Sequence, residues 1–212
     1  MEILTAFGRT LGFSLAAGVN LYATVAVLGL ASRYGWVQLP EQFKAFDNPW
    51  IIGVATALYL VEFIADKIPW VDSLWDSVHT VIRPVGGALI AVAALGQASP
   101  FFQVLTALVG AAVAAGGHVT KAGTRVAINT SPEPFTNWIA SLLEDVFVVV
   151  LSLLTLKYPL LSLVVCAFIL FAIVLLARKI WQWLRPRPQI STEGPPASST
   201  LGKASAGGRV EP

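Results

Sequence analysis

The chain has 212 residues, of which 56% are hydrophobic and only 12% are charged, and its mean hydropathy is +0.72. Soluble domains carry about a quarter charged residues, so this composition excludes an ordinary soluble protein and indicates a protein of the lipid bilayer. Residues 185–212 contain four bases and two acids, which give the whole formal net charge of +2. The neutral chain before them argues against a nucleic acid as the main partner.

Six apolar stretches predict an all-α, polytopic membrane protein with about six transmembrane spans. The first stretch, residues 3–32, is too long for an ordinary signal peptide and is expected to be retained. Within it, small residues and a polar Asn at positions 16–20 indicate close packing or a local break. The other stretches begin at Pro49, Pro84, Pro100, near Asn137 and near Pro159.

Proline suits the first turn of a helix, because no hydrogen bond is lost there and its φ angle is already helical. A bilayer core takes about 20 helical residues. The stretch of residues 84–95 is therefore too short alone and must depend on the polar segment before it.

That polar segment holds the first concentration of charge. Glu62 and Asp66 are four positions apart and share one face of the second span. Beyond Pro69, a single helical stripe follows, formed by Asp72, Asp76, His79 and Arg83. We predict a short amphipathic or re-entrant helix near residues 70–83. Its stripe either faces solvent at the membrane surface or turns inward to line a polar cavity, and the acids favour the cavity because surface anchors use Lys and Arg.

The second concentration lies further along the chain. His118, Lys121 and Arg125 share one helical face, and the segment 129–134 should then break the helix. Glu144 and Asp145 follow about two turns inside the next apolar span. The two bases could simply anchor a helix end, but buried carboxylates need partners or protons. We therefore expect Glu144 and Asp145 to pair with Lys121 or Arg125.

Topology follows from the distribution of Lys and Arg. Six spans with both termini in the cytoplasm place eleven of the fourteen bases inside, so an inner-membrane protein with cytoplasmic N- and C-termini is predicted. Residues 1–184 would form the transmembrane domain and residues 185–212 a disordered tail rich in Pro, Gly, Ser and Ala. Weak matches between residues 48–51 and 136–139, and between 17–20 and 116–119, indicate either a 3+3 inverted repeat or chance similarity.

The order of these motifs resembles that of a known family. The resemblance is carried by Glu62-Phe-Ile-Ala-Asp66-Lys67-Ile-Pro69, by Arg83-Pro84, by Ser131-Pro132-Glu133-Pro134 and by Glu144-Asp145. On these motifs the chain, over roughly residues 4–176, looks like an uncharacterised bacterial membrane family catalogued as domain of unknown function 4126. The resemblance implies a multi-pass membrane protein and brings no established activity, substrate or catalytic residue.

The leading hypothesis is a small transporter or channel-like protein in which the two charged groups meet and bind an ion or a small polar solute. The substrate- or ion-binding residues would be Glu62, Asp66, Asp72, Asp76, His79, Arg83, His118, Lys121, Arg125, Glu144 and Asp145. One alternative is a membrane-embedded enzyme acting on a lipid headgroup, in which Asp72, Asp76 and His79 either hold a metal or act as acid–base groups. Another is a scaffold whose charges only pair. No cofactor is predicted, the bilayer is the expected partner, and a homo-oligomer is compatible with the sequence.

Overall fold

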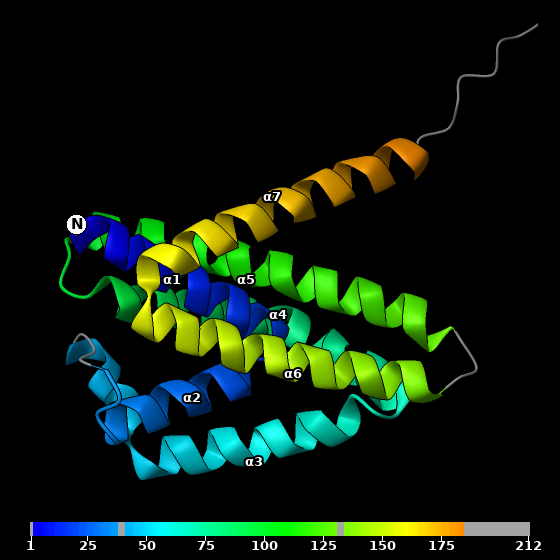
Figure 1. The fold of residues 1–212 in the computed structure, drawn as a ribbon, viewed down its shortest axis with the longest axis horizontal. Coiled ribbons are helices and arrows are strands. Elements are labelled where there is room, and N and C mark those ends of the chain that lie inside the picture. The colour runs from blue at the N-terminus through cyan, green and yellow to red at the C-terminus, as the bar shows by residue number, and fades with distance from the viewer. Residues whose placement is uncertain (1, 38–40, 131–133, 185–212) are drawn as a thin grey trace, which may run out of the picture.

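The structure, a computed structural model, describes residues 2–37, 41–130 and 134–184, and its regular elements in these ranges are all helical, which confirms the all-α prediction. In chain order they are α1 (Glu2–Val19), α2 (Leu21–Arg33), the 3-10 helix η1 (Glu41–Asp47), α3 (Pro49–Ala65), α4 (Pro69–Leu95), α5 (Pro100–Asn129), α6 (Pro134–Lys157) and α7 (Pro159–Leu184) (Figure 1). The predicted tail and residues 131–133 of the predicted break lie outside the described residues.

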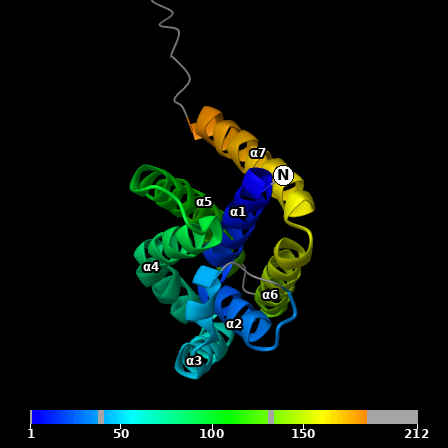
Figure 2. The ribbon, with the colours of Figure 1, turned by 90° about the vertical axis from the view of Figure 1, so that its left-hand side faces the viewer.

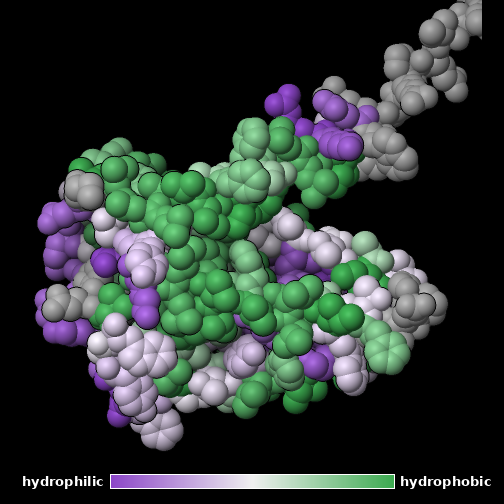
Figure 3. Space-filling model, in the orientation of Figure 1, coloured by the Kyte–Doolittle hydropathy of each residue, from purple (hydrophilic) through white to green (hydrophobic). Residues whose placement is uncertain are grey.

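The longer helices have the dimensions of membrane spans. Helices α4, α5, α6 and α7 are long and apolar enough to cross a bilayer, and η1 with α3, bent by 67°, makes a fifth candidate. Large apolar side chains are exposed along these helices, and the face in Figure 3 is hydrophobic over most of its middle. The chain is thus a helical membrane protein. The six predicted spans are not confirmed.

Prolines begin the helices as the sequence predicted, with one exception. Helices α3 to α7 all start with proline. Pro84, however, lies inside α4, so the predicted start of a third span there is wrong. The separate amphipathic helix predicted near residues 70–83 is the first part of this 27-residue helix. The helix continues through Pro84 because its polar stripe is buried against neighbouring helices, which stabilise a backbone that lacks one hydrogen bond.

The first apolar stretch breaks at Asn20 into α1 and α2, so the local break that its polar Asn indicated is present and the stretch is not one continuous helix. Asn20 has an extended backbone, and its Oδ1 accepts a hydrogen bond from the amide of Ala23 at 2.9 Å, which caps α2. The Thr24 hydroxyl donates to the Asn20 carbonyl at 2.8 Å. The polar side chain within the apolar run therefore marks a chain reversal.

Helices α1 and α2 form a hairpin that enters and leaves at the same end of the molecule (Figures 1 and 2). Near the start of α1, Gly8 packs against the backbone of Pro159 at the junction of α6 and α7. Near the end of α2, Leu28 shares a hydrophobic cluster with Phe43 and with Leu156 of α6. The start of α1 and the end of α7 consequently lie at opposite ends of the molecule, whereas the six-span topology placed them together.

Helix α1 is the central element of the bundle and packs on α4, α5 and α7. The approach is close because small residues meet, as is common between membrane helices. A Cβ atom on Gly18 would overlap the backbone of Ala114, and Gly117 lies beside Gly18. The segments 17–20 and 116–119 thus touch each other, but the inverted repeat that their similarity indicated is not confirmed.

Candidate functional site

The eleven predicted site residues come together within four helices. Glu62 and Asp66 end α3, the Asp72–Arg83 stripe occupies the first part of α4, His118 to Arg125 lie late in α5, and Glu144 and Asp145 are in α6. Ten of these residues are buried, and Glu144 has a side chain that is 17% exposed. The stripe of α4 therefore turns inward.

Arg83 and Lys121 connect the acids of α3 with those of α4 and α6. Arg83 Nη2 lies 2.8 Å from Glu62 Oε1, and its Nη1 lies 3.2 Å from Asp76 Oδ1. Lys121 Nζ lies 3.2 Å from the same Glu62 oxygen, 2.9 Å from Asp66 Oδ2 and 3.5 Å from Glu144 Oε2. Glu62 is thus shared between two bases.

Arg125 joins α3 to the start of α6. Its Nη2 lies 2.8 Å from Glu144 Oε2 and 3.2 Å from Asp66 Oδ2. Its Nη1 donates to the carbonyl oxygens of Asp66 and Asn137 and to Asn137 Oδ1. Glu144 therefore pairs with both expected bases, while Asp145 forms an ion pair with neither. We call these four acids and three bases the ion-pair network: Glu62, Asp66, Asp76, Glu144, Arg83, Lys121 and Arg125.

Hydrogen bonds fix the protonation of His118 in this arrangement. Arg83 Nη1 lies 2.7 Å from His118 Nδ1, and since a guanidinium can only donate, Nδ1 must be unprotonated. His118 Nε2 then carries the hydrogen and donates to the Thr80 hydroxyl at 3.1 Å. That hydroxyl donates in turn to the Asp76 carbonyl. The contact with Arg83 thus requires a neutral His118.

His79 has the opposite tautomer. Its Nδ1 lies 2.7 Å from the carbonyl oxygen of Trp75, which can only accept, so Nδ1 carries a hydrogen. Its Nε2 lies 3.0 Å from the Tyr22 hydroxyl, which donates to it when the ring is neutral. His79 therefore contacts α2 and its own helix, and it has no direct bond to an acid among the described residues.

Two carboxylates stand outside the ion-pair network and are held by neutral amides. Asp72 Oδ2 accepts from Asn129 Nδ2 at 2.8 Å, and Asp145 Oδ1 accepts from Asn20 Nδ2 at 3.2 Å. Neither asparagine was among the predicted site residues. Both could have been found from the sequence, because Asn20 lies in the segment that indicated a local break and Asn129 begins the segment predicted to end the helix of Arg125.

The eleven predicted site residues together, called the charged cluster from here on, contain more negative than positive charge. With both histidines neutral, six carboxylates face three cations, so full ionisation would leave three net negative charges. Four of the six acids also have one buried oxygen without a hydrogen bond from a described residue: Glu62 Oε2, Asp66 Oδ1, Asp72 Oδ1 and Asp145 Oδ2. Buried carboxylate oxygens without partners are costly, which favours a bound cation or protons.

Two cavities reach the ion-pair network from different sides of α5. One, of about 220 Å³, lies between α4 and α5 and is lined by Asp76, Arg125 and several hydroxyl residues. The other, of about 310 Å³, lies among α1, α5, α6 and α7 and is lined by Lys121 and Glu144 together with apolar side chains. Figure 3 shows hydrophilic surface in the hollow between α7 and α6. The charged pairs of Arg125 and Lys121 separate the two cavities.

The metal site suggested for Asp72, Asp76 and His79 does not form. Asp72 binds Asn129, Asp76 faces Arg83 and His79 binds Trp75 and Tyr22. Among the described residues, no three His, Cys, Asp or Glu side chains converge as metal ligands. The geometry therefore gives no support to the metal-dependent reading of this stripe.

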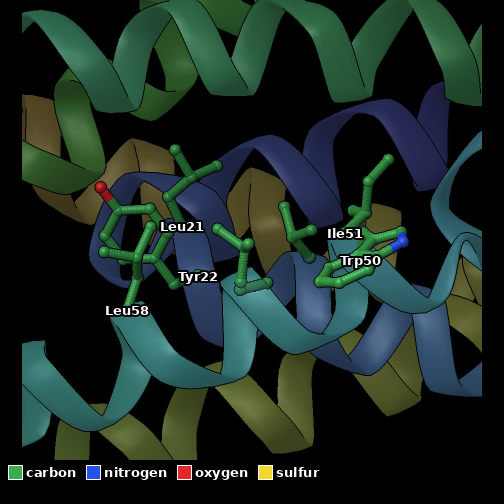
Figure 4. A pocket seen from close by; sticks show the side chains of 8 residues that line it. Leu21, Tyr22, Trp50, Ile51 and Leu58 are labelled. Atoms are coloured by element: carbon green, nitrogen blue, oxygen red, sulfur yellow. The ribbon is translucent and has the colours of Figure 1, made fainter.

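Another cavity lies away from the ion-pair network and is apolar. It measures about 380 Å³ and lies between α2 and α3, where Leu21, Trp50, Ile51 and Leu58 surround it (Figure 4). Its main polar group is the hydroxyl of Tyr22, which is already bonded to His79. A groove of this kind on a membrane protein suits lipid chains, and it carries none of the predicted site residues.

A family model described as a domain of unknown function, DUF4126, matches residues 8–179 of the chain. The match covers the hairpin, the whole cluster and most of α7. Neither a curated protein sequence nor a solved structure matches the chain.

Proposed function

Because this chain belongs to the DUF4126 family, whose description assigns no activity, we propose from its geometry that it is a small membrane transporter or channel-like protein that moves a cation through the buried charged cluster. The observation that carries the proposal is the meeting of six acids and three bases inside a membrane domain. Ionisable groups at membrane depth are expensive and mark ion and proton pathways.

A purely structural network fits these observations less well. Buried ion pairs rarely stabilise a protein more than apolar packing would, so stability alone gives little reason for ten buried ionisable groups. A structural network would also be balanced, whereas this cluster has three excess acids. The cavities beside α5 give an ion access to charged residues of the network, namely Asp76 and Arg125 in one and Lys121 and Glu144 in the other.

The broken hairpin supports the same function. Transporters often place their substrate sites where helices are interrupted at mid-membrane, because the freed helix ends and side chains there can bind an ion. Here the break at Asn20 lies beside Asp145, halfway along the 24-residue α6.

We propose an orientation in the inner membrane with the end of α7 in the cytoplasm. Lys67, Arg178 and Lys179 lie at that end, and the four bases of residues 185–212 follow it in sequence. With α3 to α7 as five crossings and α1–α2 as a re-entrant hairpin, the N-terminus would lie on the opposite side.

Flux into proteoliposomes tests the function. The purified protein should move protons or a small monovalent cation down an imposed gradient, and Asp76→Asn or Glu144→Gln should reduce the rate at least tenfold. Glu41→Gln, an exposed carboxylate on η1, is the matched control and should keep the rate of the unmodified protein. Two outcomes would contradict transport and favour the scaffold hypothesis. One is unchanged flux in folded Asp76→Asn and Glu144→Gln proteins, and the other is flux no higher than that of empty vesicles in every protein tested.

A further inference from the structure

We propose that the cation bound and moved at this site is the proton, and that Asp145 is the carboxylate that carries it at the centre of the membrane. This inference rests on the proposed function, since it names the substrate of the same internal site. Asp145 lies at the midpoint of the 24-residue α6, far from both helix ends.

The partners of Asp145 distinguish it from its neighbour Glu144. Glu144 pairs with Arg125 at 2.8 Å and with Lys121 at 3.5 Å. Asp145 is 6% exposed, and its only hydrogen bond from the described residues comes from the neutral amide of Asn20. Its Oδ2 is buried and has no partner there. An ionised carboxylate in this position would be desolvated without a counter-ion, and a bound proton removes that cost.

The charges around Asp145 act in the same direction. The titratable groups that face it are Glu62, Asp66 and Tyr59 of α3, Lys67 after α3, and Lys121 of α5. Glu62 and Asp66 are acids that disfavour a further negative charge. Lys121 favours it, but its Nζ already contacts three other carboxylates. Lys67 donates to the Phe63 carbonyl at 2.8 Å.

Asp72 also accepts a hydrogen bond from an asparagine amide, but it lies in a different part of the fold. It is buried as well, but it lies in the first turn of α4. The positive end of the helix macrodipole there stabilises an ionised Asp72, whereas Asp145, in the middle of α6, lacks this stabilisation. Of the two carboxylates outside the ion-pair network, Asp145 is therefore the one that a proton stabilises most.

The geometry favours a proton over a metal ion. A metal cation needs several oxygen ligands around one point, and no three acidic or histidine side chains converge in this way among the described residues. A proton needs a single lone pair. A proton from water forms an O–H bond at Oδ2 and cancels one negative charge, and its return to water restores the carboxylate, with no other bond changed.

Infrared difference spectroscopy of the purified protein in lipid tests the assignment. In difference spectra between pH 5 and pH 8, the unmodified protein should gain at pH 5 the carbonyl stretching band of a protonated, buried carboxylic acid, and this band should be lost in Asp145→Asn. Glu144→Gln and Glu41→Gln should retain it. Asn20→Ser keeps a good helix cap but removes the amide donor, so it should shift the band to higher frequency without abolishing it. A band that survives in Asp145→Asn, or no such band in the unmodified protein, would overturn the assignment.

Parallel flux measurements keep this inference separate from the proposed function. If the Asp145 band is present but the protein moves no ion, the proposed transport is contradicted and the protonation of Asp145 is supported. Flux of Na⁺ or K⁺ that is unchanged in Asp145→Asn, without proton movement, would support transport and reject the proton. Proton flux lost in Asp145→Asn together with the band supports both.

Discussion

Arg83 binds two carboxylates and a neutral histidine without any exposure to solvent. Removing a buried base leaves its acids charged and without compensation, which costs about 3–5 kcal/mol. We therefore expect Arg83→Leu to lower the free energy of unfolding by about that amount, measured by denaturant-induced unfolding in detergent. Arg33→Leu is the control, because Arg33 pairs with Asp47 at 3.7 Å on the surface, where a pair contributes about 0–1 kcal/mol.

A double variant tests whether the loss of stability in Arg83→Leu comes from the Glu62 carboxylate that Arg83 no longer neutralises. Arg83→Leu combined with Glu62→Leu should cost less than Arg83→Leu alone, because Glu62, which would have lost one of its two bases, is gone. Costs that simply add would contradict the coupling between Arg83 and Glu62 that the 2.8 Å contact implies.

At the scale of single residues, the sequence predicted which residues would be buried together and the bases that pair with Glu144, but not the other pairs. The spacing of Asp72, Asp76, His79 and Arg83 was sufficient to place them on one face of a helix. The pairing of Glu144 followed from its depth in an apolar span. The bond between Asn20 and Asp145 could not be predicted, since the two residues are 125 positions apart and only the tertiary fold brings them together.

Among the elements, α4 and α5 show how small residues set the distance between helices. A Cβ atom on Gly110 would overlap the Cβ atom of Ala91, whereas the same atom on Gly116 would meet nothing within 4 Å. Alanine favours a helix by about 1 kcal/mol over glycine. Gly116→Ala should therefore unfold at the same or a higher temperature. Gly110→Ala should lose about 1–3 kcal/mol through overpacking. Equal thermal stability of the two variants in detergent would contradict the close contact.

The helix ends were the most predictable feature and the interruptions the least. Proline at the first turn is a local signal, so the starts of α3, α5 and α7 could be predicted from it. Pro84 gives the same local signal inside a helix, and only the burial of the preceding polar stripe distinguishes the two cases. The break at Asn20 sits in an apolar run long enough for one span, so hydropathy favoured a single helix.

On the scale of the whole molecule, the hairpin changes the topology. Cysteine labelling with a membrane-impermeant maleimide tests this in a Cys166→Ser background, since the native Cys166 is buried. Glu2→Cys and Lys44→Cys should be labelled from the same side of the membrane, and Arg178→Cys from the other. Labelling of Glu2→Cys and Arg178→Cys from the same side would contradict the five crossings and support a topology with an even number of crossings.

The order in which the charges occur along the chain also matters during synthesis. Four of the network's residues, including three of its acids, lie in α3 and α4, whereas Lys121 and Arg125 emerge only with α5. Until then, Arg83 is the one base of the ion-pair network that has been made; it pairs with Glu62 and Asp76, whereas Asp66 still lacks both of its bases. The partly made protein should therefore stay near the insertion machinery or bound to a chaperone until α5 arrives. A nascent chain arrested after α4 should be extracted and degraded faster than one arrested after α5.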